Sequence, residues 1–176
     1  VLAEGRHVPD RAPEGKRIAF VKVVQEDVLV QDEPWPTWPN ALHAQTDEDV
    51  IRRELLFREG AAYEQARIDE SMRNLRGLGI FSLVRITAVR TSEPEAVGIV
   101  VYARARWSRR AETAFAGTGA AFAGTFQLVE RNLFGRDKQL GASFGIAPYT
   151  YSVRQLYGDH RMFGERQSLG QSFDVI

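Results

Sequence analysis

The residues from Val50 to Ile86 constrain the fold more than any other stretch of this sequence. They hold two segments with apolar residues at helical spacing, each followed by glycine, and then a run typical of a strand. The second segment, Glu64 to Leu78, predicts an amphipathic helix whose apolar face carries Ile68, Met72, Leu75 and Leu78. A helix, a second helix and a strand are therefore expected in that order.

The first of these helices carries capping signals. Thr46 followed by Asp49 predicts a variant capping box, and Gly60 is expected to close the helix as a left-handed cap. A connection rich in proline, Gln31 to Thr46, precedes the helix. Its Trp35 and Trp38 are expected to cover a sheet edge or core margin, with an exposed aromatic contact site as the less favoured alternative.

Three strands are predicted around the two helices. The runs Arg17 to Val24, Phe81 to Thr91 and Val97 to Trp107 are rich in β-branched and aromatic residues. The last two are joined by a short turn with Pro94, which predicts a hairpin, whereas the first must join through a long crossover. The expected fold is an α+β domain over 17–108, after a lead-in over 1–16: a mixed three-stranded sheet with two helices on one face.

From Ala111 onward the helical period disappears. Apolar residues alternate with small or polar ones in segments of roughly ten residues, which predicts about four antiparallel strands over 109–176. We expect the first strand to run from Thr113 to Leu128, with Ala114, Ala116, Ala120, Phe122, Phe126 and Leu128 on one face. Strands of a membrane barrel and strands of a soluble sandwich both give this alternation.

Composition excludes several classes of function. The sequence has 23 basic and 23 acidic residues and no cysteine, so neither a nucleic-acid footprint nor a thiolate metal site is expected. His7, His43 and His160 have no paired ligand spacing. The glycine-rich run Gly117 to Gly124 lacks the following helix of a phosphate loop. We expect no catalytic residue, metal or cofactor, and no enzymatic activity.

Two motifs resemble those of a known family. The segment from Glu54 to Ile86 resembles a POTRA domain in Leu55, Gly60, Tyr63, Ile68, Leu75, Leu78, Gly79, Phe81 and Val84. Residues Arg131 to Gly145, RNLFGRDKQLGASFG, resemble the turn between the first two barrel strands of BamA/TamA-type outer-membrane proteins. The resemblance implies a POTRA domain followed by the start of an outer-membrane barrel.

This resemblance implies a role in outer-membrane protein assembly or translocation. The protein would lie in the bacterial outer membrane with its POTRA-like domain in the periplasm. Its partners would be unfolded outer-membrane or secreted client proteins, outer-membrane lipid and accessory periplasmic or lipoprotein subunits, without nucleic acid. Clients would add to an exposed strand edge by β-augmentation. The edge residues expected for this are Leu83, Val84, Arg85, Ile86, Thr87, Ala88 and Val89.

A second site follows from the same resemblance. The first barrel strand would form a weakly paired seam through which clients leave, and its residues are Thr113, Phe115, Gly117, Gly119, Phe122, Gly124 and Phe126. The sequence departs from the family in the long connection before the first helix, and it lacks a later barrel motif and most barrel strands. We therefore expect a fragment of a longer protein.

Two other functions are left open by the sequence. One is a transporter of the two-partner-secretion type, which serves one dedicated partner. The other is a structural periplasmic scaffold, in which the alternating segments belong to a soluble sandwich. An enzyme domain beyond these residues is neither supported nor excluded.

Overall fold

The structure is a computed structural model that describes residues 8–26, 45–117, 122–159, 161–162 and 169–175. The chain divides into two compact units. The first holds described residues 8–26 and 47–106, and the second holds 45–46 and the described residues from 107 onward. The predictions for Trp35 and Trp38 lie outside the described residues.

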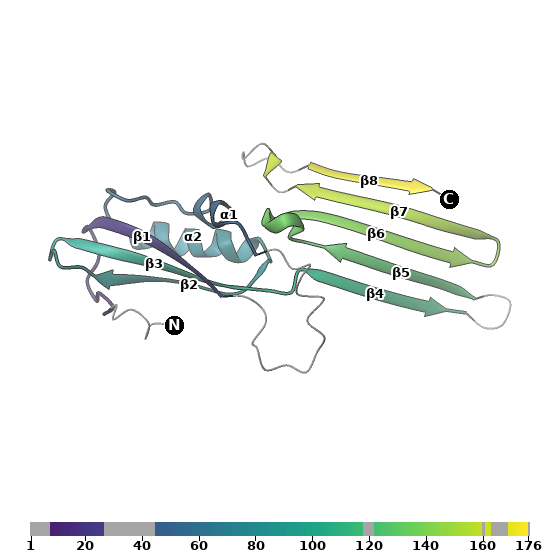
Figure 1. The fold of residues 1–176 in the computed structure, drawn as a ribbon, viewed down its shortest axis with the longest axis horizontal. Coiled ribbons are helices and arrows are strands. Elements are labelled where there is room, and N and C mark those ends of the chain that lie inside the picture. The colour runs from purple at the N-terminus through teal and green to yellow at the C-terminus, as the bar shows by residue number, and fades with distance from the viewer. Residues whose placement is uncertain (1–7, 27–44, 118–121, 160, 163–168, 176) are drawn as a thin grey trace. The chain divides into compact units, whose positions relative to one another are not determined.

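The first unit is a mixed sheet with two helices (Figure 1). Strand β3 lies in the centre, parallel to β1 and antiparallel to β2, which confirms the predicted hairpin and mixed sheet. The long crossover between β1 and β3 accommodates the parallel pairing. Its elements in chain order are β1 (Arg17–Glu26), α1 (Glu48–Arg52), α2 (Gln65–Gly77), β2 (Phe81–Arg90) and β3 (Ala96–Ala105).

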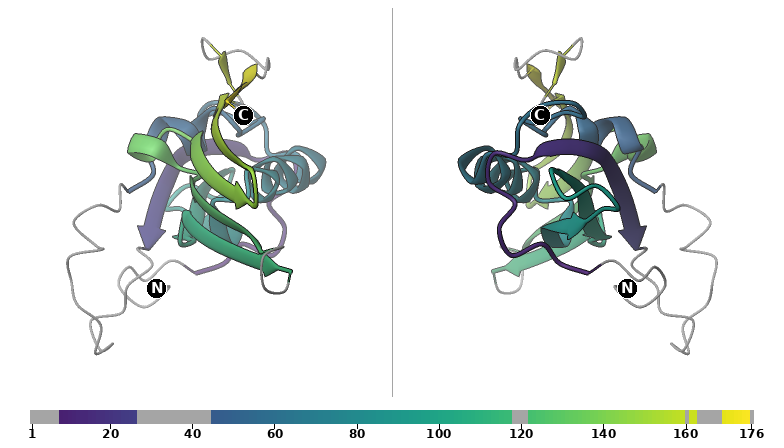
Figure 2. Two further views of the ribbon diagram at one scale, coloured as in Figure 1. Left: turned by 90° about the vertical axis from the view of Figure 1, so that its right-hand side faces the viewer. Right: turned by 90° about the vertical axis from the view of Figure 1, so that its left-hand side faces the viewer.

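The hydrophobic core of this unit lies between the sheet and α2. Figure 2 shows α2 on one side of the three strands. Ile68 and Leu75 of the helix and Ile99 and Val101 of β3 belong to one buried cluster. β3 is also buried on its other face, where the ring of Phe20 would come within 2.2 Å of a Cβ atom added at position 98. A glycine, Gly98, is therefore needed there.

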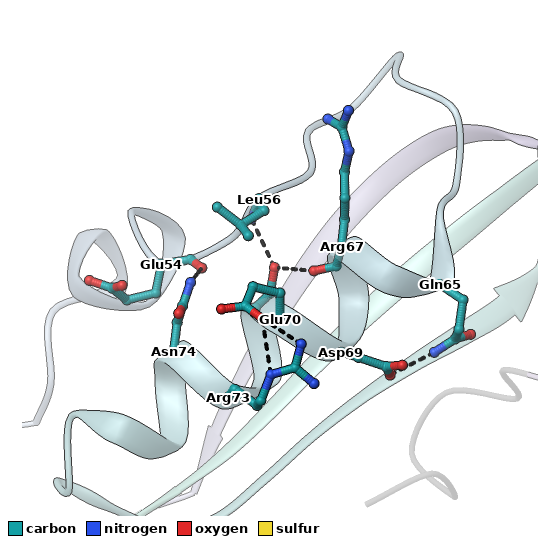
Figure 3. Close-up of polar contacts among 9 residues, drawn as sticks. Glu54, Leu56, Gln65, Arg67, Asp69, Glu70, Arg73 and Asn74 are labelled. Atoms are coloured by element: carbon teal, nitrogen blue, oxygen red, sulfur yellow. Dashed lines mark hydrogen bonds and ion pairs between the residues drawn. The ribbon is translucent and has the colours of Figure 1, made fainter.

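Polar contacts fasten the segment after α1 to α2 (Figure 3). The backbone N–H of Leu56 donates to Ser71 Oγ (2.8 Å), and that hydroxyl donates to the carbonyl of Arg67 (2.7 Å). Asn74 Nδ2 donates to the carbonyl of Glu54 (3.4 Å). These bonds give partners to backbone groups of an irregular segment, which would otherwise lose water without replacement.

The signals around the first helix were misread. α1 ends at Arg52, and Gly60 instead forms a turn at φ +82°, with its N–H donating to the carbonyl of Ile18 (2.8 Å). The N-cap residue is Asp47, which makes no side-chain capping bond, so the predicted capping box is wrong. Thr46 is buried, and its hydroxyl accepts a hydrogen bond from Asn132 Nδ2 (2.9 Å).

The second unit is one antiparallel sheet in which each strand pairs with the next (Figure 1). The sequence predicted about four strands, but the sheet has five: β4 (Arg109–Ala116), β5 (Ala123–Glu130), β6 (Lys138–Ala147), β7 (Thr150–Asp159) and β8 (Leu169–Val175). In the part of the chain that the structure describes, β4 and β8 do not pair with each other, so the sheet is not closed.

The difference in strand number arises at Thr113–Leu128, which forms a hairpin rather than one strand. Gly117 follows β4 at φ +104°, a backbone conformation that glycine favours. Phe115 lies opposite Gly124 and Thr113 opposite Phe126. The hairpin reverses the alternation, so Ala114 and Ala116 lie on the face opposite Phe126 and not, as predicted, on the same one.

Candidate functional site

Strand β2 is an edge of the first sheet, because β3 pairs with it on one side only. Two hydrogen bonds identify which residues point outward: the carbonyl of Ala88 and the N–H of Arg90 both bond to the lead-in segment. Both groups of one strand residue point the same way and neighbouring residues alternate. The outward backbone groups therefore belong to Val84, Ile86, Ala88 and Arg90.

Both ends of this outer edge are occupied. At one end the N–H of Arg90 donates to the carbonyl of Val8 (2.8 Å), and the N–H of Asp10 donates to the carbonyl of Ala88 (3.0 Å). At the other end Arg76 of α2 donates through Nη2 to the carbonyl of Val84 (3.2 Å). Each contact satisfies an outward acceptor or donor of β2.

These contacts leave a short window of the edge, centred on Ile86, unoccupied. It consists of the N–H groups of Val84, Ile86 and Ala88 and the carbonyl of Ile86. Among the described residues, no backbone hydrogen bond reaches these four groups from outside the sheet. The predicted site Leu83–Val89 therefore lies on one edge strand, but only its centre is open.

The side chains of the window belong to the core. Val84 and Ile86 are 2% and 9% exposed and pack under α2, whereas Leu83 and Arg85 are exposed on the other side. Val89 is fully buried and offers no side chain to a partner. A strand that adds here would meet mainly backbone groups, an arrangement that places few demands on client sequence.

The lead-in segment is held by a short ion pair. Lys16 Nζ lies 2.6 Å from Asp10 Oδ2, and the N–H of Ala12 donates to Asp10 Oδ1 (3.1 Å). The Lys16 hydrogen bond, followed by that of Ala12, lowers the pKa of Asp10 from its ordinary value. Lys16 itself is fixed through its backbone, because its carbonyl accepts from the N–H of Tyr63 (2.8 Å).

The second unit has two unlike faces. Strand register places large apolar side chains on one face, and each of them is exposed. The opposite face carries mainly small or polar residues, including the ion pair between Arg154 and Asp174. The apolar face consists of Phe115, Phe126, Leu128, Leu140, Phe144, Ile146, Tyr151, Val153, Leu169, Phe173 and Val175.

The predicted seam residues are distributed over two strands. Thr113 and Phe115 lie on the edge strand β4, but Gly124 and Phe126 lie on β5, which pairs on both sides. The rings of Phe115 and Phe122 stack at 6.0 Å, and Phe115 also covers Gly124, where an added Cβ would lie 3.1 Å from its ring. Gly117 is in the connection, and Gly119 lies outside the described residues.

The turn after β5 contains a polar network that the sequence analysis did not recognise. Asn132 is buried, its Oδ1 accepts from the N–H of Asp137 (2.9 Å), and its Nδ2 donates to Thr46. The N–H of Asn132 donates to Glu130 Oε1 (2.8 Å), and Glu130 pairs with Arg109 (2.9 Å). The turn signal at Asn132 was visible in the sequence, but its distant partner Thr46 was not.

No group of three or more His, Cys, Asp or Glu side chains able to hold a metal ion occurs in the described ranges. None of the helices that the structure describes is long and apolar enough to span a membrane.

Comparison with known proteins agrees with this architecture. The POTRA family, described as a surface antigen variable number repeat, matches residues 43–105. A Treponema pallidum protein named "Putative outer membrane protein assembly factor" is 24% identical over 136 residues. That match covers 74% of this chain and 16% of the relative, so the chain spans about a sixth of that relative's length.

A solved structure extends the likeness to both units. BamA from Haemophilus ducreyi lacking POTRA domains 1–3 has a TM-score of 0.64 at 16% identity, over 89% of this chain and 27% of that one. The shared fold therefore includes strands of a BamA barrel as well as a POTRA domain. The family-model match and the shared fold identify a POTRA domain over residues 43–105, and the chain as a whole shares its fold with part of BamA.

Proposed function

We propose that this protein takes part, without enzymatic activity, in the assembly or translocation of outer-membrane proteins, and that its POTRA domain receives client strands at the β2 edge. The observation that carries the proposal is the open window around Ile86. Its four backbone groups face away from the sheet and lack a backbone partner among the described residues. An extended client can supply the complementary donors and acceptors.

The second unit supports the membrane part of this proposal. Strand β6 has 10 residues, Lys138–Ala147. At about 3.4 Å per residue and a tilt of about 45°, it spans about 24 Å, close to the apolar band of an outer-membrane barrel. Its exposed Leu140, Phe144 and Ile146 would then contact lipid. Clients received by the POTRA domain would thus reach a membrane-embedded sheet of the same protein.

Backbone direction determines how the edge can be tested. Arg85 and Thr87 point their N–H groups toward β3, so proline at either position would damage the sheet rather than its outer edge. Ile86→Pro removes the central outward donor. Its matched control is Ile86→Ala, which also removes the buried side chain but keeps the N–H.

The measurement is the affinity of the intact protein for a fluorescent peptide with the β6 sequence, Lys138–Ala147. We expect Ile86→Pro to bind about tenfold more weakly than Ile86→Ala, because it lacks one hydrogen bond and its ring obstructs the edge. Circular dichroism verifies that both variants are folded. Equal affinities in the two folded variants would reject the edge as the receiving site.

A further inference from the structure

The lead-in residues Val8–Asp10 pair with the outer edge of β2, but only over a short distance. Pro9 pairs with Val89 in an isolated antiparallel bridge, flanked by the two hydrogen bonds to Ala88 and Arg90. Beyond Asp10 the chain bends away, so no described lead-in residue reaches the edge at Ile86. The lead-in therefore covers one end of the edge and leaves the other end to Arg76.

The lead-in segment is held weakly in comparison with the strands of the sheet. Val8 is 55% exposed and Pro9 is also exposed, so docking of the lead-in segment buries little apolar surface. Val8–Asp10 are attached to the rest of the domain through two backbone hydrogen bonds to β2 and the ion pair of Asp10 with Lys16. Such an attachment can be exchanged for a longer strand without unfolding the core.

Pro9 also stops the sheet from growing outward. The backbone groups of Val8 and Asp10 face β2, so position 9 faces away from the sheet, where proline has no N–H to offer. Proline at an edge is a known device against further strand addition. An incoming strand that needs the Ala88–Arg90 end of β2 must therefore displace the lead-in rather than pair with it.

We propose that Val8–Asp10 is a built-in competitor for client strands, and that the Asp10–Lys16 ion pair sets how readily it yields the edge. This inference rests on the proposed function of β2. With the lead-in docked, a client has four outward backbone groups around Ile86. Its release adds the carbonyl of Ala88 and the N–H of Arg90, and so extends the receiving edge toward the end of β2.

Two variants of the intact protein should release the lead-in, each to a different degree. Asp10→Asn removes the charge that pairs with Lys16, and Asp10→Pro also removes the N–H that bonds to Ala88. Glu48→Gln is the matched control, because it neutralises a carboxylate of an exposed ion pair with Arg52, on α1 rather than on the edge. The first readout is hydrogen exchange of the Arg90 amide relative to the Val101 amide in β3.

The second readout is the affinity for the β6-sequence peptide. We expect both Asp10 variants to speed exchange at Arg90 and to bind the peptide about threefold or more tightly than the unmodified protein, with Asp10→Pro giving the larger change. Once the lead-in is released, it no longer reduces the fraction of protein whose β2 edge is available to the peptide. Glu48→Gln should change neither readout.

The two proposals can fail separately. If Arg90 exchange rises and the unmodified protein binds the peptide, but the Asp10 variants bind it no more tightly, the lead-in is not a competitor and β2 remains the receiving edge. Unchanged Arg90 exchange in both variants would also overturn the inference, because the lead-in would not depend on Asp10. If no variant binds the peptide although Arg90 exchange rises, the receiving function of β2 itself is rejected.

Discussion

The two units of this chain use apolar residues in opposite ways. In the POTRA domain they fill a core, and even the central strand β3 is buried on both faces. In the second unit Val129 is the one buried hydrophobic residue among those described, and the large apolar side chains lie exposed on one face. The POTRA domain thus buries its own apolar side chains, whereas the second unit leaves most of its described large apolar side chains exposed.

This contrast supports our proposal that the receiving edge lies in the POTRA domain. The side chains of β2 are anchored in a core, so its outward backbone groups are held in place for a partner. In the described part of the second unit, the strands have no comparable core on either face. These strands are stabilised by hydrogen-bonded pairing along the sheet and, in our proposal, by contact with lipid.

The largest effect is expected from a substitution that leaves a cavity in the POTRA core. Ile99 is fully buried at the centre of β3. Ile99→Ala should lower the free energy of unfolding of this unit by about 2–5 kcal/mol, because it removes buried methylene groups and leaves a void. The measurement is denaturant-dependent hydrogen exchange of β3 amides, such as that of Val101.

Phe144→Ala is the counterpart in the second unit. Its ring is 46% exposed on the apolar face, so its loss should leave β3 exchange unchanged and instead weaken binding to phosphatidylcholine vesicles, by about tenfold. The contrast would be refuted if Phe144→Ala destabilised β3 as much as Ile99→Ala, or left vesicle binding unaltered.

An effect smaller than that of Ile99→Ala is expected in the second unit, in the buried polar network around Asn132. Asn132→Ala removes the acceptor for the buried N–H of Asp137 and the donor to Thr46. The turn should become less stable by about 1–3 kcal/mol, because buried polar groups lose their partners. Amide exchange at Asp137 measures it, and Asn74→Ala, which removes a longer 3.4 Å bond in the POTRA domain, is the control. Exchange at Asp137 that does not respond would mean that Asn132 does not order the turn.

The sequence predicted the POTRA unit well because its signals are local. The apolar face of α2, the glycines that end it and the strands β2 and β3 lie where periodicity and breakers indicated. The errors concern residues whose partners are distant. Thr46 looked like a helix cap because Asp49 follows it, but its hydroxyl is engaged by Asn132, 86 positions away.

The candidate site was predicted only in outline. Strand order identified β2 as an edge, but the contacts of Arg76 and the lead-in that narrow it to Ile86 come from other elements. In the second unit, glycine and alanine on both sides of Gly117 concealed the hairpin, because small residues alternate without a clear apolar face. The structure places Gly117, with its positive φ, directly after β4.

The smallest effect expected is that of pH on docking of the lead-in. It should distinguish the core of the POTRA domain, which pH leaves intact, from the weakly held lead-in. Hydrogen bonding to Lys16 and Ala12 lowers the pKa of Asp10, so the docked lead-in favours the ionised carboxylate. The stabilisation of the docked lead-in by the Asp10 carboxylate is fully present above the ordinary aspartate pKa of about 4. It is lost as pH falls through the lowered pKa. Acidification through that range should speed exchange of the Arg90 amide relative to the Val101 amide, while β3 stays protected.

Lys16→Met should return the Asp10 pKa, measured from its carboxyl carbon shift by NMR, toward the ordinary value. A pKa that does not rise in this variant would show that Lys16 does not hold the lead-in in place.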